Sequence, residues 1–398
     1  MSPPRLRFVM HGSFILPVLF ALTALSPLWS NGIEGPGNPR IGRDLFVGKG
    51  CIRCHSIGES SGKKGPSLAS VGMGRNLYEL CASLWSHWSR MNALLVRDKQ
   101  PRNSLTAAEF RDIIAYLYYL NYNSESGDPA SGEDVFLKKG CIKCHVTEPL
   151  EGAKKQKPGR PVYEMVQFQT PVNLAVGVWN HGPGMFRTMS TESMRWPEFQ
   201  DKEVTHLVAF IRSRNGAPRD SDMVPPGDPS RGQVLFAAKS CVSCHKYGIK
   251  AAPAPNFAAT GKVASVSALI ASLWNHYPKM SEAISTSGVR YSKIEREEMA
   301  DLLAYIYWLK ASGLAGNPAA GRNLYESKLC SSCHSPSGPK ASSAPSLMRS
   351  EATDSAYALL AAIWNHGPRM ESLLRERNIP WPSLTGEEMR NLVAYLRK

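Results

Sequence analysis

Cys51-Ile52-Arg53-Cys54-His55 is the first of four stretches that decide how this chain folds. All four follow the pattern Cys-x-x-Cys-His, and their first cysteines lie 90, 100 and 89 residues apart (51 to 141, 141 to 241, 241 to 330). Such regular recurrence indicates a chain built from four repeated units. The other three stretches are Cys141-Ile142-Lys143-Cys144-His145, Cys241-Val242-Ser243-Cys244-His245 and Cys330-Ser331-Ser332-Cys333-His334.

The Cys-x-x-Cys-His pattern is typical of covalent haem attachment. Two thiols about one helical turn apart can each add to one haem vinyl group, and the imidazole that follows is then the proximal ligand of the iron. A zinc site needs ligands that converge four to a metal, and neither a redox dithiol nor a structural disulfide needs the trailing His. We therefore expect four covalent haems c, attached through Cys51 and Cys54, Cys141 and Cys144, Cys241 and Cys244, and Cys330 and Cys333, with His55, His145, His245 and His334 on the iron.

Each unit opens with Gly, then Asn or Asp, then Pro, as in Gly37-Asn38-Pro39. An Asn or Asp N-cap followed by Pro in the first turn predicts the start of a helix. Each of these helices carries a glycine and then an aromatic residue, and each unit closes with an amphipathic helix that ends in Ala-aromatic. The glycine would let the closing aromatic approach, so the first and last helices of a unit are predicted to cross.

The fold expected from these repeats is all-α, with four tandem helical domains around one haem each. Their boundaries are residues 37–124, 127–224, 227–313 and 316–398, called units one to four below. The stretches between them are short and rich in Gly, Ser, Pro and Asn, which is typical of linkers. Linkers this short should hold neighbouring units in contact.

A second repeated block follows in each unit, and it supplies candidates for the distal side of the haem. His and Met lie four residues apart in this block, so they share a helix face and either could reach the iron. A Pro two residues after the His in three units predicts that the helix ends or kinks there, with the Met at the start of the next segment. The blocks run from Trp85 to Met91, Trp179 to Met185, Trp274 to Met280 and Trp364 to Met370.

This order of elements resembles tandem class I cytochrome c domains: a helix into Cys-x-x-Cys-His, a Pro-containing loop, a helix to a distal Met, and a C-terminal helix. The resemblance covers the chain from residue 37 to the C-terminus. It implies that the block's Trp packs beside the haem and that the distal ligands are Met91, Met185, Met280 and Met370. The alternative ligands are the histidines four residues earlier, His87, His181, His276 and His366.

In the same family a loop proline offers its carbonyl to the proximal imidazole N–H, which fixes the orientation of the ring. Pro66, Pro255 and Pro345 fit, because they lie 11, 10 and 11 residues after the proximal His. Unit two has a longer loop, in which Pro158 or Pro161 is expected to serve. That loop also carries Lys154, Lys155, Lys157 and Arg160, either as a docking surface or as a solvated insertion.

Two other residues are expected to have no part in haem binding. Cys81 lies on the apolar side of a helix where units three and four carry Ile or Leu, so it is interpreted as a buried small hydrophobic residue. His206 lies where the other units carry Asp or Asn and is not expected to be a ligand.

Residues 1–30 differ from the rest of the chain. Arg5 and Arg7 precede an apolar stretch, densest from Phe14 to Leu25, which predicts an export signal. Counted from Phe8 to Trp29, the same stretch is long enough for an uncleaved membrane anchor. The net charge of +14 is weak evidence for an acidic partner, because a cleaved signal and about eight haem propionates would offset much of it.

The function predicted from sequence is one-electron transfer along four haems, in the periplasm or tethered to a membrane, as in a respiratory chain. The expected partners are redox proteins, a membrane oxidoreductase complex among them, with neither nucleic acid nor a small-molecule substrate. No enzyme activity is expected, since every unit keeps both distal candidates. The alternatives are a haem enzyme with an open sixth position, such as a peroxidase or reductase, and a self-assembled, electron-conducting subunit.

Overall fold

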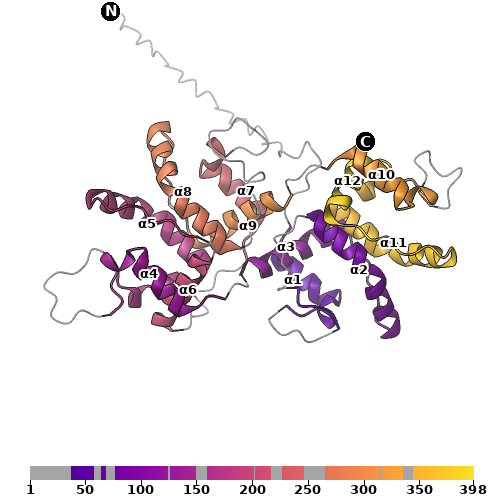
Figure 1. Ribbon diagram of the computed structural model, residues 1–398, viewed down its shortest axis with the longest axis horizontal. Coiled ribbons are helices and arrows are strands. Elements are labelled where there is room, and N and C mark those ends of the chain that lie inside the picture. Colours follow the sequence, from indigo (N-terminus) through magenta and orange to yellow (C-terminus); the bar gives the residue numbers. More distant parts are fainter. Residues whose placement is uncertain are drawn as a thin grey trace, which may run out of the picture.

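The computed structural model describes residues 37–57, 64–68, 77–123, 126–148, 159–200, 202–216, 226–245, 265–312, 316–334 and 344–398. Within these ranges the chain forms twelve α-helices and no β-strand (Figure 1). The expected all-α fold is therefore confirmed for the described residues. The predicted export signal lies outside them, and among the described helices none is both long enough and apolar enough to cross a membrane.

Each unit contributes a short first helix, a long middle helix and a last helix, with a 3-10 turn at the Cys-x-x-Cys-His motif. The first helices are α1 (Pro39–Gly48), α4 (Pro129–Lys138), α7 (Pro229–Ala238) and α10 (Pro318–Ser327). The middle helices are α2 (Leu77–Arg97), α5 (Pro171–Thr191), α8 (Val266–Ser287) and α11 (Ala356–Glu376). The last helices are α3 (Ala107–Asn123), α6 (Glu203–Asn215), α9 (Arg296–Ser312) and α12 (Gly386–Leu396).

The predicted helix starts are confirmed in all four units. The side chains of Asn38, Asp128, Asp228 and Asn317 each accept hydrogen bonds from backbone N–H groups of the first helical turn. Pro occupies the next position, where its missing N–H would have had no helical partner. The local sequence alone therefore sets where each unit begins.

The first and last helices of each unit pack across one another, as predicted. The crossing point is the glycine of the first helix, whose place no larger residue could take: a Cβ on Gly42 would lie 1.9 Å from the carbonyl oxygen of Asp112. The aromatic residue of the first helix then meets the closing aromatic, with ring centres 5.9 Å apart for Phe46 and Tyr116. The same ring contact joins Phe136 to Phe210, Phe236 to Tyr305, and Tyr325 to Tyr395.

Two polar contacts also recur in every unit. The backbone N–H of the N-cap residue donates to a side chain of the last helix, namely Asp112, His206, Asp301 or Asn391. His206 accepts this bond through Nδ1, so a structural role accounts for it. In addition, a lysine that follows the first helix pairs with a glutamate in the first turn of the last helix: Lys49 with Glu109, Lys139 with Glu203, Lys239 with Glu298 and Lys328 with Glu388.

The middle helices differ from the prediction, because they continue through Pro183, Pro278 and Pro368. An interior Pro removes one bond to the carbonyl four residues earlier. The freed carbonyl of Trp274 accepts from the Trp196 indole at 3.0 Å, and that of Trp179 accepts from the Tyr291 hydroxyl. In units two and three a neighbouring unit thus satisfies the freed carbonyl. In all three of these helices, His and Met lie on consecutive turns of one unbroken helix.

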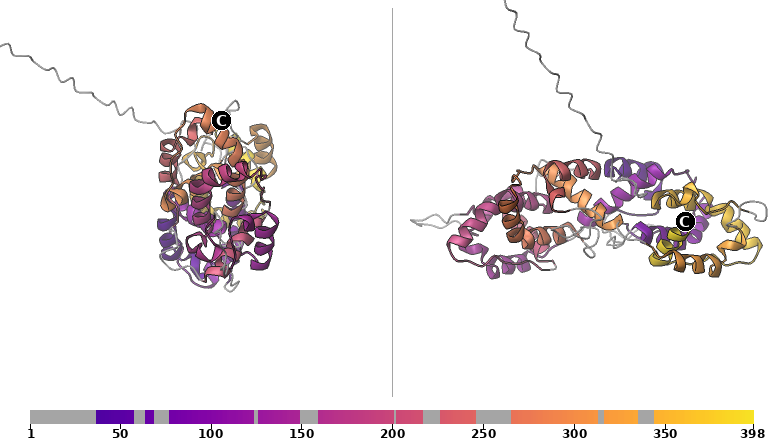
Figure 2. Two further views of the ribbon diagram at one scale, coloured as in Figure 1. Left: turned by 90° about the vertical axis from the view of Figure 1, so that its left-hand side faces the viewer. Right: turned by 90° about the horizontal axis from the view of Figure 1, so that it is seen from above.

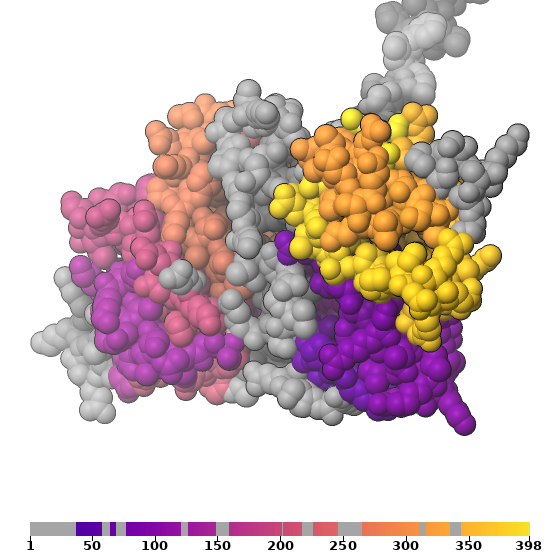
Figure 3. All heavy atoms as spheres, turned by 45° about the vertical axis from the view of Figure 1, so that its right-hand side comes forward, coloured from indigo at the N-terminus to yellow at the C-terminus, as the bar shows by residue number. Residues whose placement is uncertain are grey.

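The units do not line up in chain order. Unit two packs on unit three through α5 and α8, and unit one packs on unit four through α2, α11 and α12. The molecule is elongated, with the order two, three, one, four along its length (Figures 1 and 2). Unit four, orange to yellow, lies against unit one in the space-filling view (Figure 3). The expected contact between sequence neighbours holds for units two and three, while unit one has its most extensive contacts with the unit farthest away in sequence.

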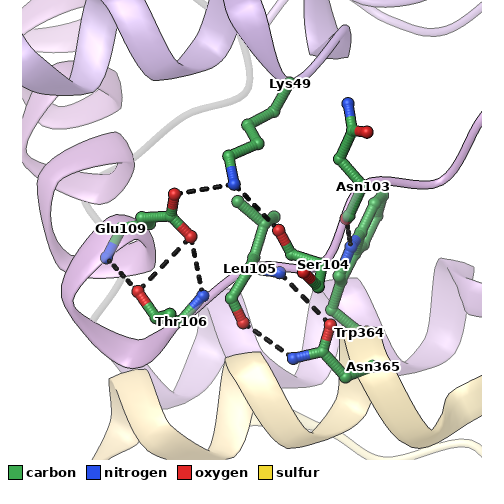
Figure 4. Close-up of polar contacts among 8 residues, drawn as sticks. All are labelled: Lys49, Asn103, Ser104, Leu105, Thr106, Glu109, Trp364 and Asn365. Carbon is green, nitrogen blue, oxygen red and sulfur yellow. Dashed lines mark hydrogen bonds and ion pairs between the residues drawn. The ribbon is translucent and has the colours of Figure 1, made fainter.

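Within each pair, the two units are joined by the same set of hydrogen bonds, here called the clasp. The indole N–H of the block's Trp donates to a backbone carbonyl of the segment before the partner unit's last helix. Trp364 donates to Asn103 at 2.7 Å, while the Asn365 side chain accepts from the N–H of Leu105 at 3.2 Å and donates to its C=O at 2.7 Å (Figure 4). The equivalent Trp bonds run from Trp85 to Pro382, Trp179 to Ser292 and Trp274 to Pro197.

The two pairs meet at a junction between units one and three. The rings of Tyr118 and Tyr307 pack edge to face there, with centres 5.4 Å apart. The junction is nearly symmetric, because equivalent positions of the two units line one small gap: Gly37, Pro39, Ala115 and Tyr118 face Gly227, Pro229, Ala304 and Tyr307.

Candidate functional site

Each Cys-x-x-Cys-His motif forms one tight turn after the first helix. The residue before the first Cys is left-handed in every unit, with φ of 86° at Gly50 and 80° at Gly140, but also 64° at Ser240 and 61° at Leu329. The His N–H then donates to the carbonyl of the first Cys, at 3.0 Å in unit one. Both thiols and the imidazole therefore come from a single turn with a fixed backbone.

The eight motif cysteines are half-buried, and none of them is in a disulfide. Burial raises the pKa of Cys51, Cys141, Cys241 and Cys330 to about 11, so these thiols are protonated at neutral pH. Within the described ranges no group of three or more His, Cys, Asp or Glu side chains could hold a bare metal ion. Each motif therefore offers two thiols and one imidazole, and the described residues show no set of four converging ligands of the kind that zinc takes.

The proximal imidazoles are held by loop carbonyls. Nδ1 of His55 lies 3.1 Å from the Pro66 carbonyl oxygen, and Nδ1 of His334 lies 2.8 Å from that of Pro345, as predicted. In unit two the prediction of Pro158 or Pro161 is wrong, because Nδ1 of His145 lies 2.8 Å from the carbonyl oxygen of Arg160. Arg160 lies between the two prolines, so the longer loop keeps the contact with a different residue. Pro255 of unit three lies outside the described residues.

A glycine next to this carbonyl lets the loop lie against the proximal ring. A Cβ on Gly65 would lie 2.7 Å from Cε1 of His55, and one on Gly159 would lie 2.6 Å from Nδ1 of His145. With Nδ1 engaged by the loop, the imidazole orients Nε2 toward a metal. The loop therefore fixes the ring plane of His55, His145 and His334 and leaves Nε2 as the ring atom that a metal could bind.

Opposite the proximal imidazole stands the His of the repeated block. The ring centres of His55 and His87 are 6.3 Å apart, those of His245 and His276 6.1 Å, and those of His334 and His366 6.2 Å. The planes cross at 60° to 65° in all three units. Burial, and then the facing imidazole, lowers the pKa of His87, His276 and His366, so these rings are neutral at pH 7, the form that binds a metal.

The candidate methionines Met91, Met185, Met280 and Met370 are half-buried, one turn beyond the His. In unit two, His145, His181 and Met185 all line one cavity of about 500 Å³, together with Cys141, Cys144 and mainly apolar residues. This volume and apolar lining fit a haem-sized group. The cavity wall also includes Ile270 and Trp274 from unit three. Which of His and Met is the distal ligand stays a prediction at this point.

Sequence reasoning missed the clasp. The block's Trp was expected beside the haem of its own unit, whereas its indole bonds to the backbone of the partner unit, and Trp274 lines the cavity of unit two. The recurring Trp-Asn pair was the available signal, since an amide side chain can bond both backbone groups of one extended residue. Cys81 is fully buried, as predicted, and its Sγ contacts the carbonyl of Ala356 in unit four.

Two regions match the family model of cytochrome c: residues 229–310 and residues 318–398. They correspond to units three and four and follow each other in tandem. The chain has no match among curated proteins and none among solved structures.

Proposed function

Because its C-terminal part consists of two tandem cytochrome c domains, we propose that the whole chain is a tetrahaem cytochrome c. Each of the four units would bind one haem c covalently, and the protein would carry single electrons along the four haems between redox partners outside the cytoplasm. Bound haem supplies a one-electron iron couple. The chain's residues attach it, ligate it and control its exposure to water.

Support for extending the assignment to units one and two comes from contacts that they share with the matched units. All four have the N-cap, the glycine crossing and the Lys–Glu pair, for example Lys139 with Glu203 at 2.9 Å. The turn around Cys141 repeats the turn around Cys241, with a His N–H to Cys carbonyl bond of 2.9 Å in both. These contacts use different residues at some positions, which favours one fold present four times.

The observation that carries the proposal is the paired arrangement of two imidazoles and two thiols at each motif. Ring spacings agree to within 0.2 Å in three units, and the fourth has a cavity of suitable volume. In units one, three and four the block's His stands opposite the proximal His, and in unit two both line the cavity, so each site offers a candidate for the sixth ligand. This favours an electron carrier over a peroxidase or reductase, which needs a site where substrate can bind the iron.

Export is supported by the basic and then apolar sequence of residues 1–30. The partners would be other redox proteins, at a membrane oxidoreductase complex or within a larger conducting assembly. Fractionating cells that make the full chain tests the location: recovery of holoprotein in the cytoplasm alone would contradict it.

The test of the function is a haem count followed by redox titration. Intact-mass analysis should give four haems per chain, and each double Cys→Ala variant of one motif should lose one, with Cys51→Ala/Cys54→Ala and Cys141→Ala/Cys144→Ala as the informative pairs. All four haems should take up one electron reversibly, without binding peroxide or carbon monoxide. A count of two would limit the assignment to units three and four, and carbon monoxide binding to the unmodified protein would favour an enzyme.

A further inference from the structure

We propose that the distal ligand of the haem iron is the histidine of the repeated block, His87, His181, His276 or His366, rather than the methionine four residues later. This inference rests on the proposed function, because it concerns how each haem would be held. It assigns two imidazoles to each iron.

The first argument is the distance between the facing rings. Two imidazoles that share one metal ion through bonds of about 2 Å place their ring centres roughly 6 Å apart. The measured separations are 6.3 Å in unit one, 6.1 Å in unit three and 6.2 Å in unit four. Rings that merely packed against each other at an edge would be free to come closer or slide.

The second argument is that this geometry recurs among different neighbours. The residue after the His is Trp88 in unit one, Tyr277 in unit three and Gly367 in unit four. Despite this change from the largest side chain to none, the crossing angle stays between 60° and 65°. In unit two, His181 and His145 line the same cavity. A spacing kept through such changes indicates a shared ligand as the constraint.

The third argument concerns the methionines. The middle helix continues through Pro278, so Met280 follows His276 on the next turn of the same helix. One turn of α-helix is about 5.4 Å long. If the imidazole stands opposite the proximal ring, the Met side chain lies a turn away along the helix and packs beside the haem as a flexible apolar contact.

Unit three offers a matched pair of variants on α8, His276→Ala and Met280→Ala, in the full-length holoprotein. The unmodified protein should lack the near-infrared band of a Met–iron bond. Reduced His276→Ala should bind carbon monoxide at one haem of four, and reduced Met280→Ala at none. The reverse result, or a Met–iron band from the unmodified protein, would overturn the proposal.

A third variant, His276→Met, covers the case in which the alanine variant does not fold. It should gain a Met–iron band from one haem and raise the potential of that haem alone, because Met ligation favours the reduced iron. An unchanged spectrum would contradict the histidine assignment. Failure of the proposed function would look different, since the haem content by mass would then fall below four per chain before any variant is made.

A separate observation, the packing of the units, leads us to infer a second point: the haems form two close pairs, two with three and one with four, linked at the junction of units one and three. Trp274 lines the cavity of unit two and lies two residues from His276 on α8. In the other pair the rings of Trp88, next to His87, and Trp364, two residues before His366, have centres 5.7 Å apart. Electrons would then pass in the order two, three, one, four.

Two full-length variants that retain two haems each test this order. One keeps haems one and four, by Cys→Ala at motifs two and three, and the other keeps haems three and four, by Cys→Ala at motifs one and two. Magnetic coupling between the two oxidised irons, read by electron paramagnetic resonance, should broaden the spectrum of the first variant only. Coupling in the second alone, or in neither, would overturn the order; two haems by mass confirm that each sample is suitable.

Discussion

The same clasp holds two pairs of units, but the two pairs are joined by the chain in very different ways. Units two and three are consecutive, and α6 ends at Asn215 only a short segment before α7 begins at Pro229. Units one and four stand at opposite ends of the described chain, so Trp364 and its acceptor Asn103 are 261 residues apart. Pairing is therefore a property of the unit surface, and chain connectivity decides only how strongly the pair is tethered.

The bonding also differs between the pairs. In pair two–three an Asn stands on both sides, and each bonds the N–H and C=O of one residue, Ile294 or Phe199. In pair one–four, unit one has Ser86 instead, whose hydroxyl donates to the Leu384 carbonyl at 3.2 Å and accepts from the Leu384 N–H at 3.4 Å. On one side, the pair that lacks a short tether thus makes the same two bonds through a single hydroxyl and over longer distances than in pair two–three.

Steric fit accompanies the clasp. Trp88 of unit one fills the space over Gly367 of unit four, and Tyr277 of unit three lies over Gly182 of unit two. A bulky ring therefore meets a glycine in both pairs. Two bulky units, one and three, could not meet through this face without a clash, which excludes one of the wrong pairings.

The largest effect is expected from Gly367→Leu. The Cβ would lie 2.3 Å from Cε2 of Trp88, so the variant should lose about 1–3 kcal/mol from overpacking and open pair one–four. Small-angle scattering should show a larger radius of gyration. Gly182→Leu is the matched control in the tethered pair, where the Cβ would lie 3.0 Å from the Tyr277 ring.

If pair two–three opens in Gly182→Leu while pair one–four stays closed in Gly367→Leu, then neither the short link nor the steric fit between ring and glycine controls pairing. Adding Trp88→Gly to Gly367→Leu should restore compactness, because it moves the bulk to the other side of the interface.

Next in size is Asn365→Ala, which leaves the N–H and C=O of Leu105 without their partner. The free energy of unfolding should fall by about 1–3 kcal/mol, the cost of unpaired buried polar groups. Urea unfolding followed by Trp fluorescence measures it. Asn275→Ala removes the same bonds in pair two–three. The radius of gyration should increase less in this variant than in Asn365→Ala, because the short link keeps units two and three together.

A smaller gain is expected from Ser86→Asn, which gives unit one the side chain that the other units carry. The amide would bond the N–H and C=O of Leu384 through separate acceptor and donor atoms, in place of the two long bonds that the Ser86 hydroxyl makes, and should add about 0.5–1 kcal/mol to the free energy of unfolding. A destabilised variant in the same urea experiment would mean that the local backbone around Ser86 does not accept the longer side chain.

The smallest effect concerns the Lys49–Glu109 pair, which lies beside the segment that receives Trp364 (Figure 4). The hydrogen bond from Lys49, and then that from the Thr106 N–H, lowers the pKa of Glu109 below its ordinary value of 4.5. The Lys49–Glu109 pair therefore stabilises the fold fully above about pH 4.5, and this stabilisation is lost as the pH falls through the lowered pKa of Glu109.

Lys49→Met should therefore cost less than about 1 kcal/mol at pH 7, and once Glu109 is protonated only the part due to the hydrogen bond from Lys49 Nζ to the Ser104 carbonyl should remain. A loss that persists unchanged below pH 3, roughly one unit beneath the usual carboxyl range, would assign the whole effect to the Ser104 bond and to packing, with no contribution from the ion pair.

The sequence predicts the interior of each unit well because the determining contacts are local or repeated. Asn38 caps its helix, Gly42 permits the crossing, and Pro66 meets His55 at a fixed separation along the chain. The unbroken middle helix could not be predicted, since the carbonyl that Pro278 frees is satisfied by Trp196 of another unit.

Which units pair with which could not be predicted from the sequence either. Four similar units present four similar Trp side chains, and only their spatial neighbours reveal that Trp88 belongs over Gly367. The site was predicted in its proximal half for the same reason: the Cys-x-x-Cys-His turn is local, whereas the distal side depends on the course of a whole helix.

The burial of Trp88 has a consequence for the order of folding. Its side chain is fully buried in the finished molecule, against Trp364 and Gly367 of unit four. During synthesis at roughly 5–20 residues per second, that cover arrives on the order of tens of seconds after unit one is complete. Until then the first unit carries a bare aromatic surface suited to any unit with a glycine at the matching position. Unit two carries such a glycine, Gly182, and would compete for Trp88. Unit three is synthesised next and covers Gly182 with Tyr277, so this competitor is removed before unit four is complete.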